Sequence, residues 1–354
     1  MASSPPPELA RELETSTYVL YNKTYTLHRL SPLHNLPSLS CATLASHAHR
    51  LLSILRGDVL RGVHVGLDSN ADGVVNAGRL DTCEWKLLAN GEAWERGQDA
   101  DEQGGPTAEK AAGVCIELRY EKITYMAHLL RNPNHAKRRA REGEQEDESP
   151  GVGEEGMHLP LLLMHMPSPL RSAVQDYLTT TFDTRIEEMR LSYSFLAAAL
   201  EGLLADVSSA GAGRVAKVIK DLQITLTFRG PVAPSLRTLD ITIRREDVQG
   251  FLIRGKSMAT GKDVEDTKPF MSALGAYLKA QMALDMGHED VGVAKLACGG
   301  FVLAREGKIK IVAPAGGAGV EEVEDQMGRR AVVGLMGRLF ERAEVRGFED
   351  ELGG

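Results

Sequence analysis

The chain has 354 residues, of which 43% are hydrophobic and 25% are charged, with 41 Lys and Arg against 49 Asp and Glu. These fractions are ordinary for a globular protein and exclude wholesale disorder, and the length fits roughly two domains of about 150 residues each. The formal net charge of -8 argues against a protein whose whole surface binds nucleic acid. Aromatic residues make up only 5% of the chain, which argues against a binder that stacks single-stranded bases.

The cysteines indicate a reducing compartment. They are far apart in the chain, at Cys41, Cys83, Cys115 and Cys298, so no Cys-x-x-Cys metal or redox pair exists. The residues Met1–Glu8 lack the basic start and apolar stretch of a secretory signal, and apolar runs such as Leu159–Met164 fall short of the about 20 residues that cross a bilayer. We therefore expect a soluble protein of the nucleus or cytosol, without a metal or another cofactor.

The first part of the chain predicts an antiparallel sheet with one helix. Residues 1–16 are rich in Pro and Glu and are expected to be a disordered N-terminus. A strand or hairpin is predicted over 17–30, and Ser38 is a helix-start signal for a helix to about Leu55. Three further segments have strand character: 59–67, 80–89 and 113–127. We expect residues 17–131 to form an N-terminal α+β domain.

Residues 132–156 differ sharply from what precedes them. A basic run, Lys137–Arg141, is followed by seven acidic residues between Glu142 and Glu155, with Gly and Pro among them. Because no apolar face can be drawn through this block, it is predicted to be a charged disordered insertion. The basic run is compatible with a nuclear-import signal and, equally, with a solvated charge block.

Residues 157–354 predict a second α+β domain. Helix signals cover five segments: 168–180, 192–207, 245–253, 267–284 and 321–342. Strand patterns cover 159–165, 222–229, 236–243 and 290–304, and the Glu306-Gly307 turn predicts a hairpin over 301–313. Strands and helices are mixed without strict alternation. The predicted fold class is therefore α+β, with mostly antiparallel sheets and packed helices in two sheet-containing halves.

One segment, Gly250–Ser257, has the letters of a phosphate-binding loop. Such a loop follows a strand directly and curls its backbone N–H groups around phosphate. Here Arg245–Gln249 intervene after the strand, and the loop interior holds the bulky residues Phe251, Leu252 and Ile253. A helix that ends at Gly255 accounts better for the segment. A nucleotide hydrolase that uses Lys256 and Ser257 is kept as the alternative function.

Other motifs are weaker. Asp68–Gly73 begins like a calcium loop, but the twelfth position is Arg79 and not a carboxylate. Gly211–Ala216 resembles a dinucleotide fingerprint but follows a helix. His288-Glu289 begins like a zinc-protease motif, yet Gly292 stands where the second His should be. No catalytic residue is predicted.

Several blocks in order resemble the CENP-L family of inner-kinetochore subunits, including its fungal members. They are Tyr25–Leu33, Tyr177–Asp183, Ser235–Ile241 with Arg245–Val248, Val291–Lys295 and Glu306–Ile311. The resemblance covers about residues 17–56 and 159–313. The charged block of residues 132–156 departs from the vertebrate pattern, so nothing is carried onto it.

The resemblance implies a non-enzymatic subunit of the constitutive centromere-associated network, located at the centromere and kinetochore in the nucleus. It implies that residues 157–354 dimerise with a CENP-N-like partner through their sheet, alongside other inner-kinetochore subunits. An unpaired edge strand could supply such an interface, because its backbone groups can pair with another chain. The expected interface residues are Val291, Val293, Lys295, Phe301, Lys308, Ile309, Lys310 and Ile311. The alternative is that the apolar members are core residues and the lysines a solvated face.

Contact with centromeric DNA or a nucleosome is expected through Lys295, Arg305, Lys308 and Lys310. Because the chain is acidic overall, this contact is predicted to be weak, non-specific and strongly salt-dependent. A free edge strand can also pair with its own copy, so self-association as a homodimer in the absence of a partner is a third hypothesis. No membrane contact is expected.

Overall fold

A computed structural model describes most of the predicted elements. The described residues are 20–36, 38–60, 77–88, 111–133, 156–209, 221–229, 236–258, 268–312 and 322–344. Several sequence-based predictions fall outside them: the disordered residues 1–16, the strand residues 61–67, the calcium-like residues 68–76, the segment Gly211–Ala216, and the charged insertion apart from residues 132, 133 and 156. Within the described residues, no helix combines the length and apolar composition needed to cross a bilayer.

The chain divides into two compact units. The first contains residues 1–19 and 25–188, and the second contains residues 20–24 and 189–354. The predicted domain boundary at residue 157 differs from this division. Residues 161–165 form strand β5 (Leu161–His165), which pairs with strands β4 (Thr124–Leu130) and β1 (Thr24–Leu30) of the first unit. The first unit therefore extends past the predicted boundary, to residue 188.

The first unit is an antiparallel sheet with helices packed on it. The strand order is β2-β3-β4-β5-β1, with β2 spanning Leu80–Leu88 and β3 spanning Gly113–Tyr120, and β6 (Ile186–Glu188) pairs with β1. The prediction of one strand over 113–127 is wrong, because the chain turns between β3 and β4. The Tyr120 N–H donates to the Ile123 carbonyl oxygen at 2.9 Å and fixes that turn.

Two helices of the first unit follow from their sequences. Helix α4 (Ser168–Phe182) has Pro169 in its first turn and ends at Asp183, whose φ of 49° is left-handed. Its buried residues recur at helical spacing: Leu170, Val174, Tyr177, Leu178 and Phe182. Helix α2 (Cys41–Leu60) begins later than predicted from Ser38, because the Thr43 N–H donates to Ser40 Oγ at 3.2 Å.

The second unit is also an antiparallel sheet with helices. Its strand order is β11-β10-β9-β7-β8. The strands are β7 (Leu222–Phe228), β8 (Thr238–Ile243), β9 (Val291–Ala297), β10 (Phe301–Ala304) and β11 (Lys308–Ile311). The helices are α5 (Tyr193–Ser209), α7 (Arg245–Met258), α8 (Pro269–Met282) and α9 (Glu322–Glu344). The predicted α+β fold class is confirmed.

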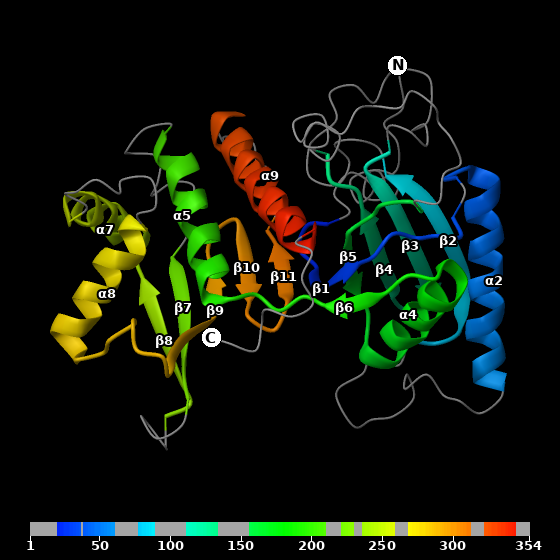
Figure 1. Cartoon of the computed structure of the whole chain (residues 1–354), viewed down its shortest axis with the longest axis horizontal. Coiled ribbons are helices and arrows are strands. Elements are labelled where there is room, and N and C mark those ends of the chain that lie inside the picture. The colour runs from blue at the N-terminus through cyan, green and yellow to red at the C-terminus, as the bar shows by residue number, and fades with distance from the viewer. Residues whose placement is uncertain are drawn as a thin grey trace, which may run out of the picture. The chain divides into compact units, whose positions relative to one another are not determined.

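One face of the second sheet is covered by helices and the other is polar. Figure 1 shows α5 and α9 on one side of strands β9, β10 and β11. The covered face carries alternating apolar residues such as Leu222, Ile224 and Leu226, all 0% exposed. The period of two in these strands places their polar residues on the opposite face.

A short stretch from the start of the chain completes this sheet. Residues 20–24 belong to the second unit. The Asn22 N–H donates to the Ile311 carbonyl oxygen at 2.7 Å, and Tyr21 forms a parallel bridge with Ile311. Strand β11 therefore has a backbone neighbour on both sides, β10 on one and residues 21–22 on the other.

Candidate interaction surfaces

The predicted interface hairpin is not an edge of its sheet. Strand β9 lies between β7 and β10, and β10 lies between β9 and β11. The bridge from Tyr21 occupies the outer side of β11. The interpretation of residues 291–313 as an unpaired edge is therefore wrong. Their alternation of apolar residues marks one buried face of an interior strand, and alternation alone does not distinguish interior strands from edges.

The predicted interface residues separate into two groups. Four apolar members lie in the core at 0–1% exposure: Val293, Phe301, Ile309 and Ile311. Val291 is half-buried on the same face. A partner could reach these core side chains only if the sheet opened. The lysines Lys295, Lys308 and Lys310 lie on the opposite face.

The lysines belong to two rows of side chains that cross all five strands. Strand register gives one row as Asp240, Thr225, Lys295, Ala304 and Lys308, and the next as Thr242, Gln223, Ala297, Val302 and Lys310. The two rows contain a single carboxylate, Asp240, which accepts a hydrogen bond from Thr225 Oγ1 at 2.6 Å. This face of the sheet therefore consists of small and polar side chains together with three lysines. We call it the lysine face.

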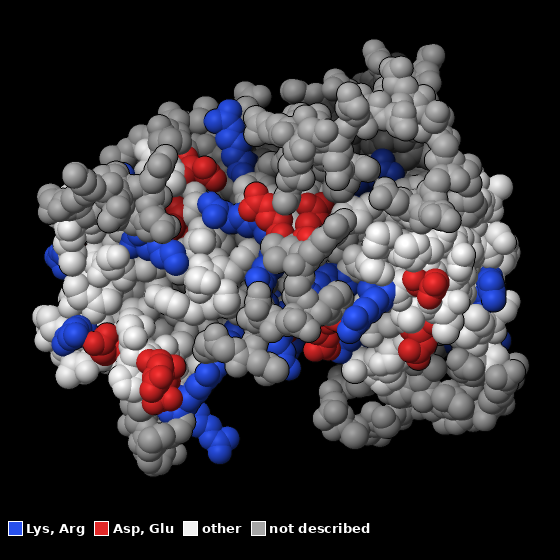
Figure 2. Space-filling view, viewed as in Figure 1, with Lys and Arg blue, Asp and Glu red and all other residues white. Residues whose placement is uncertain are grey.

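Arg305 joins this lysine face. A Cβ built on Gly292, which also points to this side, would lie 3.6 Å from an Arg305 guanidinium nitrogen. The four residues predicted to contact DNA are therefore brought together on one surface. The charge of Lys308 is partly neutralised, because its Nζ pairs with a Glu306 carboxylate oxygen at 2.9 Å. On the helix side of the second unit, seen in Figure 2, basic and acidic side chains are interspersed.

The described edge of the second sheet is β8, which pairs only with β7. The Phe228 N–H donates to the Arg237 carbonyl oxygen at 3.1 Å, so Phe228 and Arg237 are a hydrogen-bonded pair. Because such pairs alternate along an antiparallel ladder, Leu239 and Ile241 also direct their backbone groups toward β7. The backbone groups of the residues between them, Thr238, Asp240 and Thr242, face outward. Sequence reasoning identified the strand but not that it is an edge.

The corresponding edge of the first sheet, β2, is protected. Arg56 of α2 donates from its guanidinium to the backbone carbonyls of Leu80 and Asp81, with the shortest distance 2.7 Å. Lys86 on the same strand pairs with Glu84 at 2.6 Å and with Glu117 at 3.1 Å. Charged side chains on an edge and a covered edge both discourage pairing with another chain. Strand β8, with sequence TLDITI, has no cation within it.

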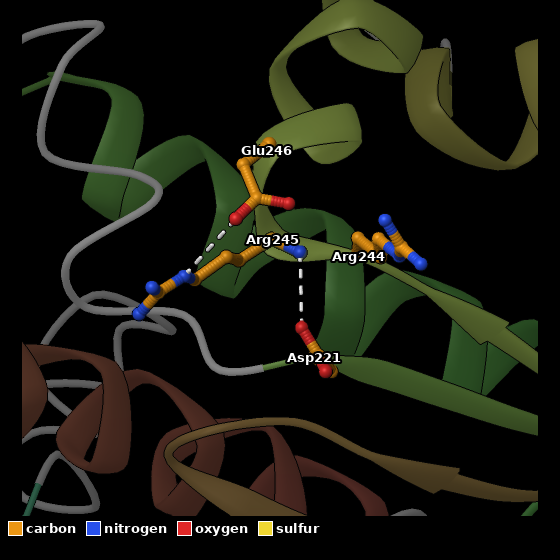
Figure 3. Close-up of a pocket in the computed structure, with 4 residues that line it drawn as sticks. All are labelled: Asp221, Arg244, Arg245 and Glu246. Atoms are coloured by element: carbon orange, nitrogen blue, oxygen red, sulfur yellow. Dashed lines mark hydrogen bonds and ion pairs between the residues drawn. The ribbon is translucent and has the colours of Figure 1, made fainter.

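A cleft lies where β8 ends and α7 begins. It is lined by Asp221, Arg244, Arg245 and Glu246 (Figure 3). The Arg245 N–H donates to Asp221 Oδ1 at 3.2 Å, and the Arg245 guanidinium lies 3.5 Å from Glu246. Arg244 points away from the other three side chains, and no carboxylate of the described residues pairs with it. Arg245 therefore contacts both carboxylates of this cleft, through its N–H and its guanidinium, whereas Arg244 contacts neither.

The segment Gly250–Ser257 is not a phosphate-binding loop. It lies inside α7, so its backbone N–H groups are helical, and Ser257 Oγ donates to the Arg254 carbonyl oxygen at 2.7 Å. The prediction that the helix ends at Gly255 is wrong, because α7 continues to Met258. Gly255 lies where α7 contacts α8. A Cβ at this position would collide with the Pro269 carbonyl oxygen. The glycine therefore serves helix packing, and the alternative of a nucleotide hydrolase is wrong.

A buried polar cluster lies between β1 and α4 of the first unit. His28 is 1% exposed, with Nδ1 3.2 Å from Gln175 Nε2 and Nε2 3.1 Å from Thr26 Oγ1. Arg171 donates to the same Thr26 oxygen at 3.2 Å. Burial, and then the Arg171 charge, lower the pKa of His28 to about 4. If the Gln175 amide donates to Nδ1, the neutral imidazole carries its proton on Nε2 and donates it to Thr26. These hydrogen bonds connect α4 to strand β1. Among the described residues, no group of His, Cys, Asp and Glu could hold a metal ion.

Comparison with known proteins gives one family. Residues 19–344 match the family described as Centromere protein L. No curated protein matches the chain. The matched segment contains every described strand and helix of both units.

Proposed function

Because the chain belongs to the Centromere protein L family, we propose that it is a structural subunit of the inner kinetochore that pairs with a CENP-N-like partner through the sheet of its second unit. The family is a structural one, and membership makes the chain an inner-kinetochore protein that associates with other such subunits. The finer proposal is that pairing helps to anchor the kinetochore on centromeric chromatin in the nucleus. The finer grouping with the fungal members of the family is also a proposal, and it rests on the resemblance of the blocks outside residues 132–156.

The observation that carries the partner proposal is the outer side of β8, with which no strand of the described residues pairs. Three residues, Thr238, Asp240 and Thr242, turn their backbone groups outward there. An added strand would gain main-chain hydrogen bonds with these groups, and its alternate side chains would meet Leu239 and Ile241 on the helix side, where both are half-buried. By comparison, the β2 edge is capped by Arg56 and charged, which opposes the same use.

Replacing Thr242 with proline should abolish binding of a CENP-N-like partner. Proline lacks the outward N–H, while pairing with β7 does not use that group, so the sheet is retained. The matched control, Thr242→Val, keeps the N–H and should bind like the wild type. Binding is measured by light scattering of the mixed chains, with circular dichroism to verify folding. Wild-type affinity of a folded Thr242→Pro chain would reject β8 as the pairing edge.

We also propose that the lysine face contacts DNA weakly and without sequence preference. Lys295 and Lys310 lie in adjacent rows with Arg305 nearby, and phosphate neutralisation requires cations gathered on one face. Changing Lys295, Lys308 and Lys310 together to Gln should reduce the slope of log affinity against log salt by up to about 3, since each phosphate contact contributes about 0.9. Fluorescence anisotropy with a duplex measures this slope. A control that changes Arg254, Lys256 and Lys279 of α7 and α8 to Gln should retain it, and equal slopes for the two variants would contradict the proposal.

Self-association remains the alternative use of the same edge. In the absence of a partner, β8 of one copy can pair with β8 of another, since a strand edge is complementary to a second antiparallel strand. Light scattering of the isolated chain over a range of concentrations tests this. A homodimer that Thr242→Pro does not dissociate would require another interface.

A further inference from the structure

We propose that the end of β8 selects its partner strand by charge: Arg244 binds a carboxylate at the N-terminal end of an antiparallel strand added to β8. This inference rests on the proposed strand addition and specifies the chemistry of the added strand. Two features of Arg244 support it: its position directly after β8 and its separation from the neighbouring carboxylates.

Arg244 directly follows the last residue of β8, between the strand and the first turn of α7. Thr238, Asp240 and Thr242 point to the lysine face. The period of two along a strand would place the side chain of Arg244 next in that series. An added strand would therefore present one side chain beside each of these four. Leu239, Ile241 and Ile243 point to the covered face and would meet apolar side chains of the added strand. The predicted partner segment alternates polar and apolar residues.

Among the charged residues on the lysine-face side of β8 and its C-terminal end, Arg244 is the one that no described carboxylate pairs with. Asp240 is occupied by the hydrogen bond from Thr225 on β7, at 2.6 Å, which draws its carboxylate away from the edge. The two carboxylates near the cleft are also engaged, Asp221 by the Arg245 N–H and Glu246 by the Arg245 guanidinium. Figure 3 shows Arg244 turned away from both. A carboxylate on the added strand would complete the pair.

The direction of the added strand follows from the sheet. Every pairing among strands β7 to β11 is antiparallel, and antiparallel pairing is slightly more stable per residue than parallel pairing. Because Arg244 follows the C-terminal end of β8, it would lie beside the N-terminal end of an antiparallel neighbour. The required acidic residue is thus the first of the added segment.

Synthetic peptides with the full-length chain test this selection. The probe is a capped heptapeptide, Glu-Val-Thr-Val-Thr-Val-Thr, whose register places Glu beside Arg244 and Val beside Leu239 and Ile241. Its matched controls begin with Gln or Lys, or carry the Glu at the opposite end. Cross-strand ion pairs contribute up to about 1 kcal/mol, so the Glu peptide should bind about 3- to 5-fold more tightly than the Gln peptide. The preference should decrease in high salt, because the pair is exposed.

Two substitutions separate Arg244 from its neighbour. Arg244→Gln should remove the preference for the Glu peptide, and Arg244→Glu should transfer the preference to the Lys peptide. Arg245→Gln should leave the preference intact, since Arg245 pairs with Glu246. Equal binding of the Glu and Gln peptides to the wild type would overturn the selection by Arg244 but not the strand addition. If none of the peptides bound, including the Gln peptide, the strand addition and this inference would both be rejected.

Discussion

Replacing Gly255 with alanine should lower the free energy of unfolding by about 3 kcal/mol, because a new methyl group would be forced against backbone atoms. The methyl would meet the carbonyl oxygen of Pro269 at the first turn of α8. A flexible side chain could move aside, but this oxygen is fixed at the start of a helix. The two helices would have to separate, and their contact includes the rings of Phe251 and Phe270, whose centroids lie 5.8 Å apart. Chemical denaturation followed by circular dichroism measures the loss.

The same motif contains its own control. Gly250 lies in the same helix, and a Cβ placed there would meet nothing within 4 Å. Gly250→Ala should therefore stabilise the protein by about 0.5–1 kcal/mol through helix propensity alone. Opposite signs for the two substitutions are the diagnostic result. Two similar changes in stability would mean that α7 and α8 do not approach at Gly255.

Lowering the pH should destabilise the first unit through His28. The pKa of His28 is lowered to about 4 in the folded protein, whereas an unfolded histidine titrates near 6.5. Protons therefore bind the unfolded chain first as the pH falls. The contribution of neutral His28 is complete above pH 6.5 and decreases between pH 6.5 and about 4, by about 3 kcal/mol in total. His47 has a lowered pKa for the same main reason, burial, and adds to the trend in the same direction.

Denaturation at several pH values, compared with His28→Gln, checks this prediction. The variant should lose part of the slope of stability against pH between 6.5 and 4, since it removes the titrating group. Arg171, Gln175 and the cross-strand neighbour Glu188 surround the site and are unchanged in the variant. The exposed His49 of α2, changed to Gln, serves as the control and should keep the wild-type slope. Identical slopes for wild type and His28→Gln would show that His28 is not the group responsible.

Local patterns predicted most individual elements. The helix starts at Ser168 and near Ser192 are correct because proline and serine act within one turn, as the bond from the Phe195 N–H to Ser192 Oγ illustrates. The family resemblance is confirmed as well. Alternation of apolar residues correctly assigned Val293, Ile309 and Ile311 to strands. These inferences depend on neighbours in sequence, which a single sequence displays.

Long-range arrangement was not accessible in the same way. Whether β9 is an edge depends on β7 and β10, and the neighbour of β11 comes from the other end of the chain. Gly255 read locally is a helix terminator, whereas its role is set by Pro269 of the next helix. The lysine face was predicted residue by residue, but its partners Thr225 and Asp240 come from strands whose register no local pattern gives. The edge at β8 escaped prediction for the same reason.

The backbone bridge from residues 21–22 to Ile311 has a consequence for how this protein is made. On the ribosome, residues 21–22 emerge before β11, which is synthesised nearly three hundred residues later. The second unit therefore stays incomplete until residues 21–22 pair with the newly made β11. A fragment that starts at residue 157 would lack residues 21–22 and would leave Ile311 of β11 without this backbone neighbour. Association measured with such a fragment would then report an artefact of truncation.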